Sequence, residues 1–332
     1  MSFQTTSRHY RLQELGEGVF AAFARDGGAA ISNAGVVNLG GSTLVVDTFL
    51  TPTAAEDLRE DAARLTGQYP RLVVNTHYHN DHIWGNQAFL PEAELISTMQ
   101  TRTLIQTAGQ EEYNEYKAMT NQRLKELLAQ QATAESQAQR DALGLWIGYF
   151  GGLQKDFPRL RVALPNLLFE ERLGLHGSRR HAEVIAFTGA HTGSDAVVYL
   201  PEDGILFMSD LLFTGFHPYL GDGNPERWLE VLGAILDGSA GIHRVNCFVP
   251  GHGPVGTAAD MQRLVDYIRV CQEMARRLVE QGKDSEAEIK AVPIPGAYAD
   301  WTMERFFYAN LRFLVERYKA GNWQIEELDK GK

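Results

Sequence analysis

A short apolar stretch of the chain runs directly into four side chains that commonly bind metals. Residues 72–86 read LVVNTHYHNDHIWGN, and the four are His77, His79, Asp81 and His82. In an extended chain alternate side chains point the same way, so His77 and His79 can hold one ion while the following turn presents Asp81 and His82 elsewhere. The stretch can therefore serve two metal ions, although a single ion or a plain polar loop also fits the pattern.

The segments around this motif alternate between strand and helix patterns. Strand signals lie at residues 11–24, 34–40, 42–49, 71–75, 161–177, 183–189, 196–210 and 245–251. Helical patterns cover residues 52–67, 257–282 and 301–318. The pair Gly40-Gly41 indicates a hairpin, and Thr257 is the expected N-cap of the helix that follows it. Strands, a helix, more strands and further helices predict an α/β fold of the αββα type, with two sheets between helical layers.

One region has a different composition from the rest. Between residues 110 and 143 the chain is rich in Gln, Glu, Ala and Lys and contains no glycine. This predicts a helical insertion at about residues 100–150 within a single domain of residues 8–332, which ends in a helical extension at about 257–320. The apolar segment ALGLWIGYF at 142–150 is either a lid over the site or a helix-packing face.

Composition and charge argue against several classes of function. A net charge of -11 gives no basic footprint for a nucleic acid. The longest apolar run, at residues 142–153, is shorter than the roughly 20 residues of a membrane-spanning helix, and the first twenty residues lack the pattern of a secretory signal. Two cysteines fit a reducing compartment. We expect a cytoplasmic enzyme that acts on a small molecule, with neither a nucleic-acid nor a membrane partner; a homo-oligomer is compatible with the sequence.

The motif from His77 to His82 resembles the signature of the metallo-β-lactamase superfamily, which comprises metal-dependent hydrolases of αββα architecture. The chain also supplies three residues that the family expects later, in the same order: His191 in GAHTGSD, Asp210 in ILFMSD and His252 in VPGHGP. The resemblance covers about residues 10–270. The helical segment at 100–150 and the final helices look like additions to the family fold.

This resemblance implies two metal sites. The first would be held by His77, His79 and His191, the second by Asp81, His82 and His252, and both by a bridging Asp210. Nitrogen and oxygen ligands without a thiolate suit two zinc ions, and the same donors accept iron or manganese. Asp81 would also act in catalysis by orienting the nucleophile.

The favoured function is a di-zinc hydrolase that cleaves a small ester, lactone or thioester by attack of a metal-bridging hydroxide. Asp210 argues against antibiotic hydrolysis, because the sequence resembles thioesterases of the glyoxalase II kind, lactonases and phosphodiesterases there, whereas true β-lactamases generally lack this aspartate. The acidic net charge disfavours a phosphodiesterase or nuclease. The alternatives are a β-lactamase-type amide hydrolase, a phosphodiesterase or nuclease, and a diiron redox protein, from whose pattern His79 departs. His217 and Tyr219, with Trp228 on the same Gly- and Pro-rich loop, are candidate substrate contacts or simply loop packing.

Overall fold

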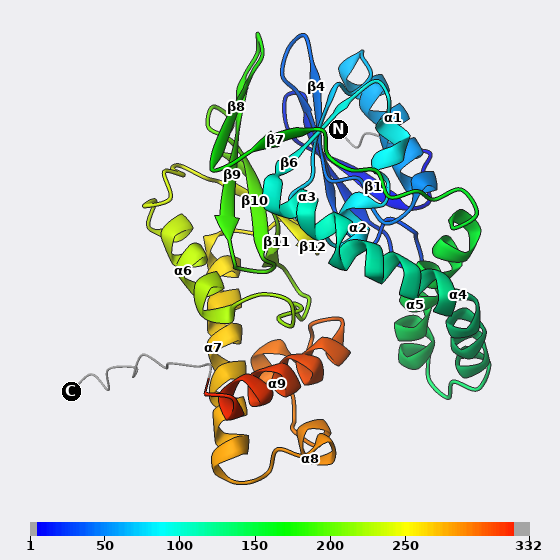
Figure 1. Ribbon diagram of the computed structural model, residues 1–332, viewed down its shortest axis with the longest axis vertical. Helices are drawn as coiled ribbons and strands as arrows, with labels where there is room; N and C mark the ends of the chain where they lie inside the picture. Colours follow the sequence, from blue (N-terminus) through cyan, green and yellow to red (C-terminus); the bar gives the residue numbers. More distant parts are fainter. Residues whose placement is uncertain (1–4, 322–332) are drawn as a thin grey trace.

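Two facing β-sheets form the centre of the protein, as the computed structural model shows for residues 5–321 (Figure 1). The first sheet consists of β1 (Tyr10–Gly16), β2 (Val19–Ala24), β3 (Ala34–Asn38), β4 (Thr43–Val46), β5 (Leu72–Val74), β6 (Glu94–Thr98) and β7 (Leu167–Phe169), in that order. Its first four strands pair antiparallel, and β4 to β7 pair parallel. Parallel strands end at the same edge of a sheet, so the loop after β5 is placed among neighbouring strand ends.

The second sheet brings together strands from the later part of the chain. Its members are β8 (Arg172–His176), β9 (His181–Thr188), β10 (Ser194–Leu200), β11 (Ile205–Phe213) and β12 (Cys247–His252). The order is β12-β11-β10-β9-β8, and only the β11–β12 pair is parallel. The parallel pair brings the ends of β11 and β12 to the same edge, where Phe213 lies opposite His252.

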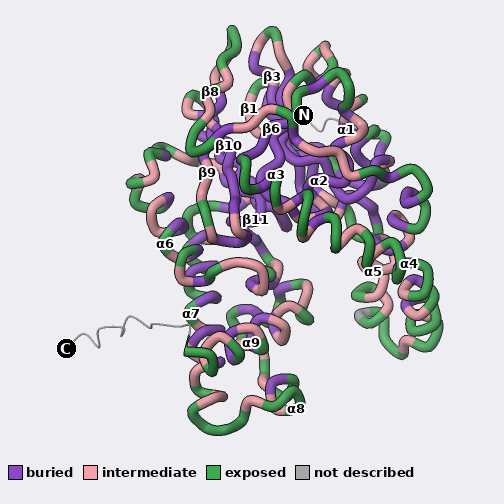
Figure 2. Tube along the Cα trace, in the orientation of Figure 1, coloured by how far each residue is buried: buried purple, intermediate pink, exposed green. Residues whose placement is uncertain are grey.

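Successive side chains point to opposite faces of each strand, and apolar side chains on both faces explain why helices cover the outer faces of the sheets. On β2, Val19, Ala21 and Phe23 belong to the apolar layer between the sheets. The intervening Phe20 and Ala22 belong to a second layer under α1 (Pro52–Thr66). Successive side chains of a strand point to opposite faces, so a strand that is apolar at every position must be covered on both sides. The buried sheets and the exposed outer helices are distinguished in Figure 2.

The helix α1 begins and ends as the sequence predicts. The hydroxyl of Thr51 accepts a hydrogen bond from the backbone N–H of Ala54, and Gly67 adopts a left-handed φ of 80° after the last turn. This left-handed backbone favours glycine, because a side chain there would clash with the carbonyl oxygen.

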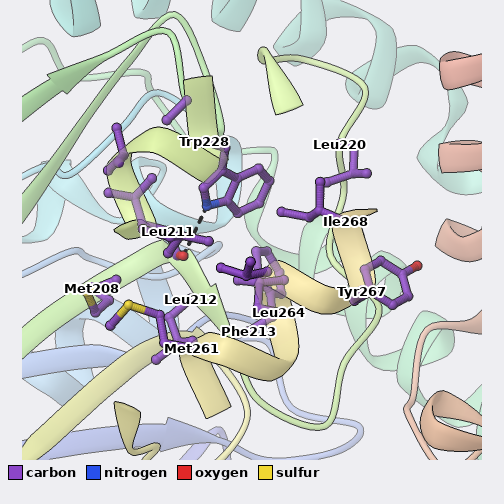
Figure 3. Close-up of a cluster of buried hydrophobic side chains, with 14 of the residues drawn as sticks. Met208, Leu211, Leu212, Phe213, Leu220, Trp228, Met261, Leu264, Tyr267 and Ile268 are labelled. Atoms are coloured by element: carbon purple, nitrogen blue, oxygen red, sulfur yellow. Dashed lines mark hydrogen bonds between the residues drawn. The ribbon is translucent and has the colours of Figure 1, made fainter. Parts of the chain in front are cut away.

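Helices α6 (Pro225–Leu236) and α7 (Ala258–Glu280) cover the outer face of the second sheet, and α9 (Glu304–Lys319) packs against α7 with the short α8 (Glu286–Lys290) beside it. Thr257 is the N-cap of α7, as predicted, and its hydroxyl donates to Asp260. The prediction that Trp228 lies on a loop is wrong. Asn224 and Pro225 start α6, and Trp228 is buried with its indole N–H donating to the carbonyl oxygen of Leu211 (Figure 3).

The predicted insertion consists of three helices, α3 (Met99–Gln106), α4 (Ala108–Ala132) and α5 (Gln137–Asp156). α4 and α5 pack against each other and extend away from the sheets (Figure 1). The two sheets with their helical layers confirm the predicted αββα class with helical additions. Within residues 5–321, no helix combines the length and the apolar character that crossing a membrane requires.

Candidate metal centre

The structure brings together all seven predicted ligands at one edge of the two sheets. They come from the loop after β5 (His77, His79), the helical turn α2, Asn80–Ile83 (Asp81, His82), the turn between β9 and β10 (His191), β11 (Asp210) and the end of β12 (His252). They form two groups, one with His77, His79, His191 and Asp210, the other with Asp81, His82 and His252. Within each group the potential ligand atoms lie within 4.8 Å of one another.

Asp210 lies between the two groups. Its Oδ2 atom is 3.3 Å from Nε2 of His191 and 3.9 Å from Nε2 of His77. Its Oδ1 atom is 3.1 Å from Nε2 of His82 and 3.5 Å from Nε2 of His252. Each carboxylate oxygen therefore faces one group, which is the geometry that a bridging ligand requires.

Two irregularities of the backbone aim Asp210 into the cluster. The register between β11 and β12 shifts at Ser209, which has a left-handed φ of 47°. On β12, a side chain at Gly251 would place its Cβ atom 1.8 Å from Oδ1 of Asp210. Gly251 is thus required for the carboxylate to occupy this position.

A second aspartate orients His79. The Nδ1 atom of His79 faces Nε2 of His191 at 3.1 Å, and its Nε2 atom lies 3.0 Å from Oδ2 of Asp222. The hydroxyl of Tyr78 donates to the same oxygen of Asp222 over 2.6 Å. A carboxylate at Nε2 keeps the proton on that nitrogen, so the Nδ1 lone pair is available to a metal.

His82 is oriented in the same way by Asp47. The Nδ1 atom of His82 lies 2.8 Å from Oδ2 of Asp47, which also accepts hydrogen bonds from the hydroxyls of Thr76 and Ser209. The Nε2 atom of His82 is left facing Asp210. Sequence reasoning missed both Asp47 and Asp222. The position of Asp47 directly after the strand TLVV was a usable signal, whereas the GDGNP loop gave none for Asp222.

The electrostatics of the cluster favour a cation. Burial lowers the pKa of His77 well below its usual value, so its imidazole is neutral. Burial also opposes a charge on His82, but the carboxylates of Asp210, Asp81 and Asp47 outweigh it and raise the pKa of His82 well above its usual value. Burial would raise the pKa of Asp210, yet His82 and His252 hold it well below its usual range. A buried ionised carboxylate among imidazoles is a suitable environment for a divalent ion.

Buried polar atoms without a hydrogen-bond partner indicate whether a metal ion would fit in the cluster. The Nε2 atoms of His77 and His82 and the Oδ1 atom of Asp210 are buried and make no hydrogen bond. Buried polar atoms without a partner are rare in native proteins, since each costs about 1–3 kcal/mol. These atoms point into the cluster beside the other donors, so the seven residues fit a divalent metal ion that would satisfy them.

The two predicted substrate contacts lie in different surroundings. His217 is buried among the C-terminal helices, where its Nδ1 atom is 3.0 Å from the hydroxyl of Tyr267 and burial lowers its pKa to about 4. Tyr219 is 36% exposed, and its ring centroid lies 6.3 Å from that of His79. Tyr219 is thus beside the cluster, whereas His217 packs against Trp301 and Phe307. The substrate roles of both residues stay predictions.

The fold and the cluster together define a metal-dependent hydrolase. The sequence matches the metallo-β-lactamase superfamily over residues 27–252, more than half of the chain, and the chain belongs to that superfamily. Among solved structures it is similar to a metallo-β-lactamase from Pontibacter korlensis, with a TM-score of 0.57 and 16% sequence identity over 78% of this chain and 99% of that chain. At this identity the likeness shows the fold alone. A comparison with curated proteins gives no match.

Proposed function

We propose that the protein binds two zinc ions and hydrolyses a small ester, lactone or thioester. The observation that carries this proposal is the position of Asp210, whose two oxygens face the two ligand groups. A donor set of imidazoles and carboxylates without a thiolate suits zinc, and iron or manganese accept the same donors. The cytoplasmic location stays a prediction, as does the small-molecule partner.

When bound, such ions lower the pKa of a water molecule from about 15.7 to roughly 7 and polarise a substrate carbonyl as Lewis acids. The chain itself supplies the orientation and the proton acceptor. Asp47 and Asp222 hold His82 and His79 in the ring orientations that direct Nε2 and Nδ1 inwards. Asp81 is partly exposed, unlike the buried Asp210, and its Oδ2 atom lies 3.4 Å from Nε2 of His252. We propose that Asp81 orients the attacking water and accepts its proton.

A substrate panel tests this function. The zinc-loaded protein would be assayed with 4-nitrophenyl acetate, a lactone, a thioester, a cephalosporin and bis(4-nitrophenyl) phosphate. We expect turnover of the first three, loss of turnover on chelation and recovery when zinc is restored. Turnover confined to the cephalosporin would replace the proposal with amide hydrolysis, and turnover confined to the phosphodiester would replace it with phosphodiester cleavage.

Two matched variants test whether the activity depends on the cluster. Asp81→Asn removes a carboxylate that faces His252, while Asp237→Asn removes one from the exposed end of α6. We expect only Asp81→Asn to lower the rate, by about 10²-fold, the usual scale for a positioned acid or base. Equal rates for both variants would remove Asp81 from the mechanism.

A further inference from the structure

The two helical additions to the fold meet at Arg305, in the first turn of α9. Its guanidinium carbon lies 3.2 Å from the ring centroid of Trp146 on α5 and 4.9 Å from that of Phe306. The N-terminal end of α9 points towards the side of the molecule on which α4 and α5 lie (Figure 1). Arg305 thus links the insertion to the C-terminal helices through ring contacts.

In the part of the chain that the structure describes, the guanidinium of Arg305 contacts aromatic rings and no acidic side chain. Within residues 5–321, no hydrogen bond or ion pair to Arg305 is present, whereas Arg312 on the same helix pairs with Glu286 over 2.7 Å. The side chain of Arg305 is exposed, although its crowded surroundings lower its pKa to about 10, so it remains charged at neutral pH. Stacking on Trp146 occupies one face of the guanidinium and leaves its N–H edge free to donate.

Two sets of interactions place the charge of Arg305 near the metal centre. On one side, the ring of Phe306 lies 5.5 Å from that of Tyr219, which lies 6.3 Å from the ring of His79. On the other side, burial raises the pKa of Tyr116, and the charge of Arg305 lowers it while the charge of Asp81 raises it, so both charges lie near this ring. Arg305 is therefore separated from a candidate ligand by two aromatic rings.

We propose that Arg305 binds a carboxylate on the substrate while the carbonyl to be cleaved lies at the metal centre, so that the enzyme prefers acidic esters or thioesters. The inference deepens the proposed function and rests on it for the place of the reaction. A planar guanidinium forms paired, charge-assisted hydrogen bonds with a carboxylate, and stacking on Trp146 orders it for this geometry. On α7 and α9, Arg276 and Arg277 pair with Glu273 and Arg317 pairs with Glu226, whereas Arg305, held between two added elements, is available to supply the charge.

Binding can be measured without hydrolysis. The probes are 4-nitroanilides of dicarboxylic acids with two to six methylenes, each paired with the neutral 4-nitroanilide that lacks the carboxylate. Calorimetric titration of the zinc-loaded protein should show one chain length at which the acid binds about tenfold more tightly than its neutral partner. Arg305→Met should abolish this preference, Arg305→Lys should retain part of it, and Arg312→Met should leave it intact. Equal binding of each pair, or no binding of any probe, would overturn the inference.

A kinetic experiment distinguishes carboxylate recognition by Arg305 from a purely structural role of this residue. With 4-nitrophenyl esters of the same acids, Arg305→Met should lower the ratio of kcat/KM for acid over neutral ester by about tenfold, mainly through KM. If Arg305 only fastened α9 to α5, both esters would be affected equally and the ratio would not change, which would contradict the inference. A binding preference for the acid without hydrolysis of any ester, lactone or thioester would support the inference while refuting the proposed function.

Discussion

The Nδ1 atom of His82 lies 2.8 Å from Oδ2 of Asp47, and both side chains are fully buried. Asp47 follows β4 and His82 follows β5, the neighbouring parallel strand, so the contact joins adjacent ends of one sheet. Asp222 makes the corresponding contact with His79 from a distant loop. Each ligand group thus contains one histidine whose orientation depends on a carboxylate outside the cluster.

Asp47→Asn should weaken the metal affinity of the group that contains His82. The amide can no longer stabilise a proton on Nδ1 as a carboxylate does, and the loss of such a partner typically costs 10–100-fold in affinity. Metal content after dialysis against graded chelator would measure it. Asp222→Asn is the matched variant and should weaken the other group instead. Equal loss of both ions from both variants would contradict separate roles.

Gly251→Ala should displace the Asp210 carboxylate, because the added Cβ atom would lie 1.8 Å from Oδ1. We expect the loss of about one ion per chain, with the fold retained, as measured by elemental analysis and circular dichroism. Gly233→Ala on α6 is the control, since nothing lies within 4 Å of its added Cβ atom. That substitution should raise stability by about 0.5–1 kcal/mol, the usual gain for alanine within a helix. Full metal content in Gly251→Ala would show that Asp210 can move without loss.

Asp210→Ala should affect catalysis far more than stability. Without the carboxylate the two ions would repel each other more strongly, and the first would stay on His77, His79 and His191. We expect hydrolysis to fall by about 10²-fold or more, roughly 3 kcal/mol of transition-state stabilisation. Rate, metal content and melting temperature should be measured on the same sample. Near-normal turnover with two ions retained would reopen the β-lactamase alternative.

Metal removal should lower the melting temperature. The protein as isolated is expected to carry about two divalent ions per chain, bound by loops that only the folded state brings together. Ligands that bind the folded state alone stabilise it by about 2.7 kcal/mol at a hundredfold excess over Kd. Calorimetry before and after chelation, with metal loss verified, measures the change. An unchanged melting temperature would show that the loops are held in place without metal.

The αββα class and the family could be predicted from the sequence because they depend on patterns of neighbouring residues and on the order of motifs along the chain. Alternation in β2, the glycine after α1 and the spacing from His77 to His82 are short-range patterns, and each determines its own element. The later segments containing His191, Asp210 and His252 resemble the family motifs in order as well as in residue type. Trp228 shows the limit of this reasoning, since the Gly- and Pro-rich residues before it concealed the start of α6.

The sequence by itself therefore determined the fold class and the list of candidate ligands. Only the tertiary structure decided which atoms of those ligands face one another and which residues hold them there. Asp222 lies 143 residues from His79 along the chain, and Trp146 and Arg305 belong to different additions to the fold. No periodicity or spacing encodes such contacts, because they arise when separate elements pack, and the ring orientation of a ligand depends on that packing.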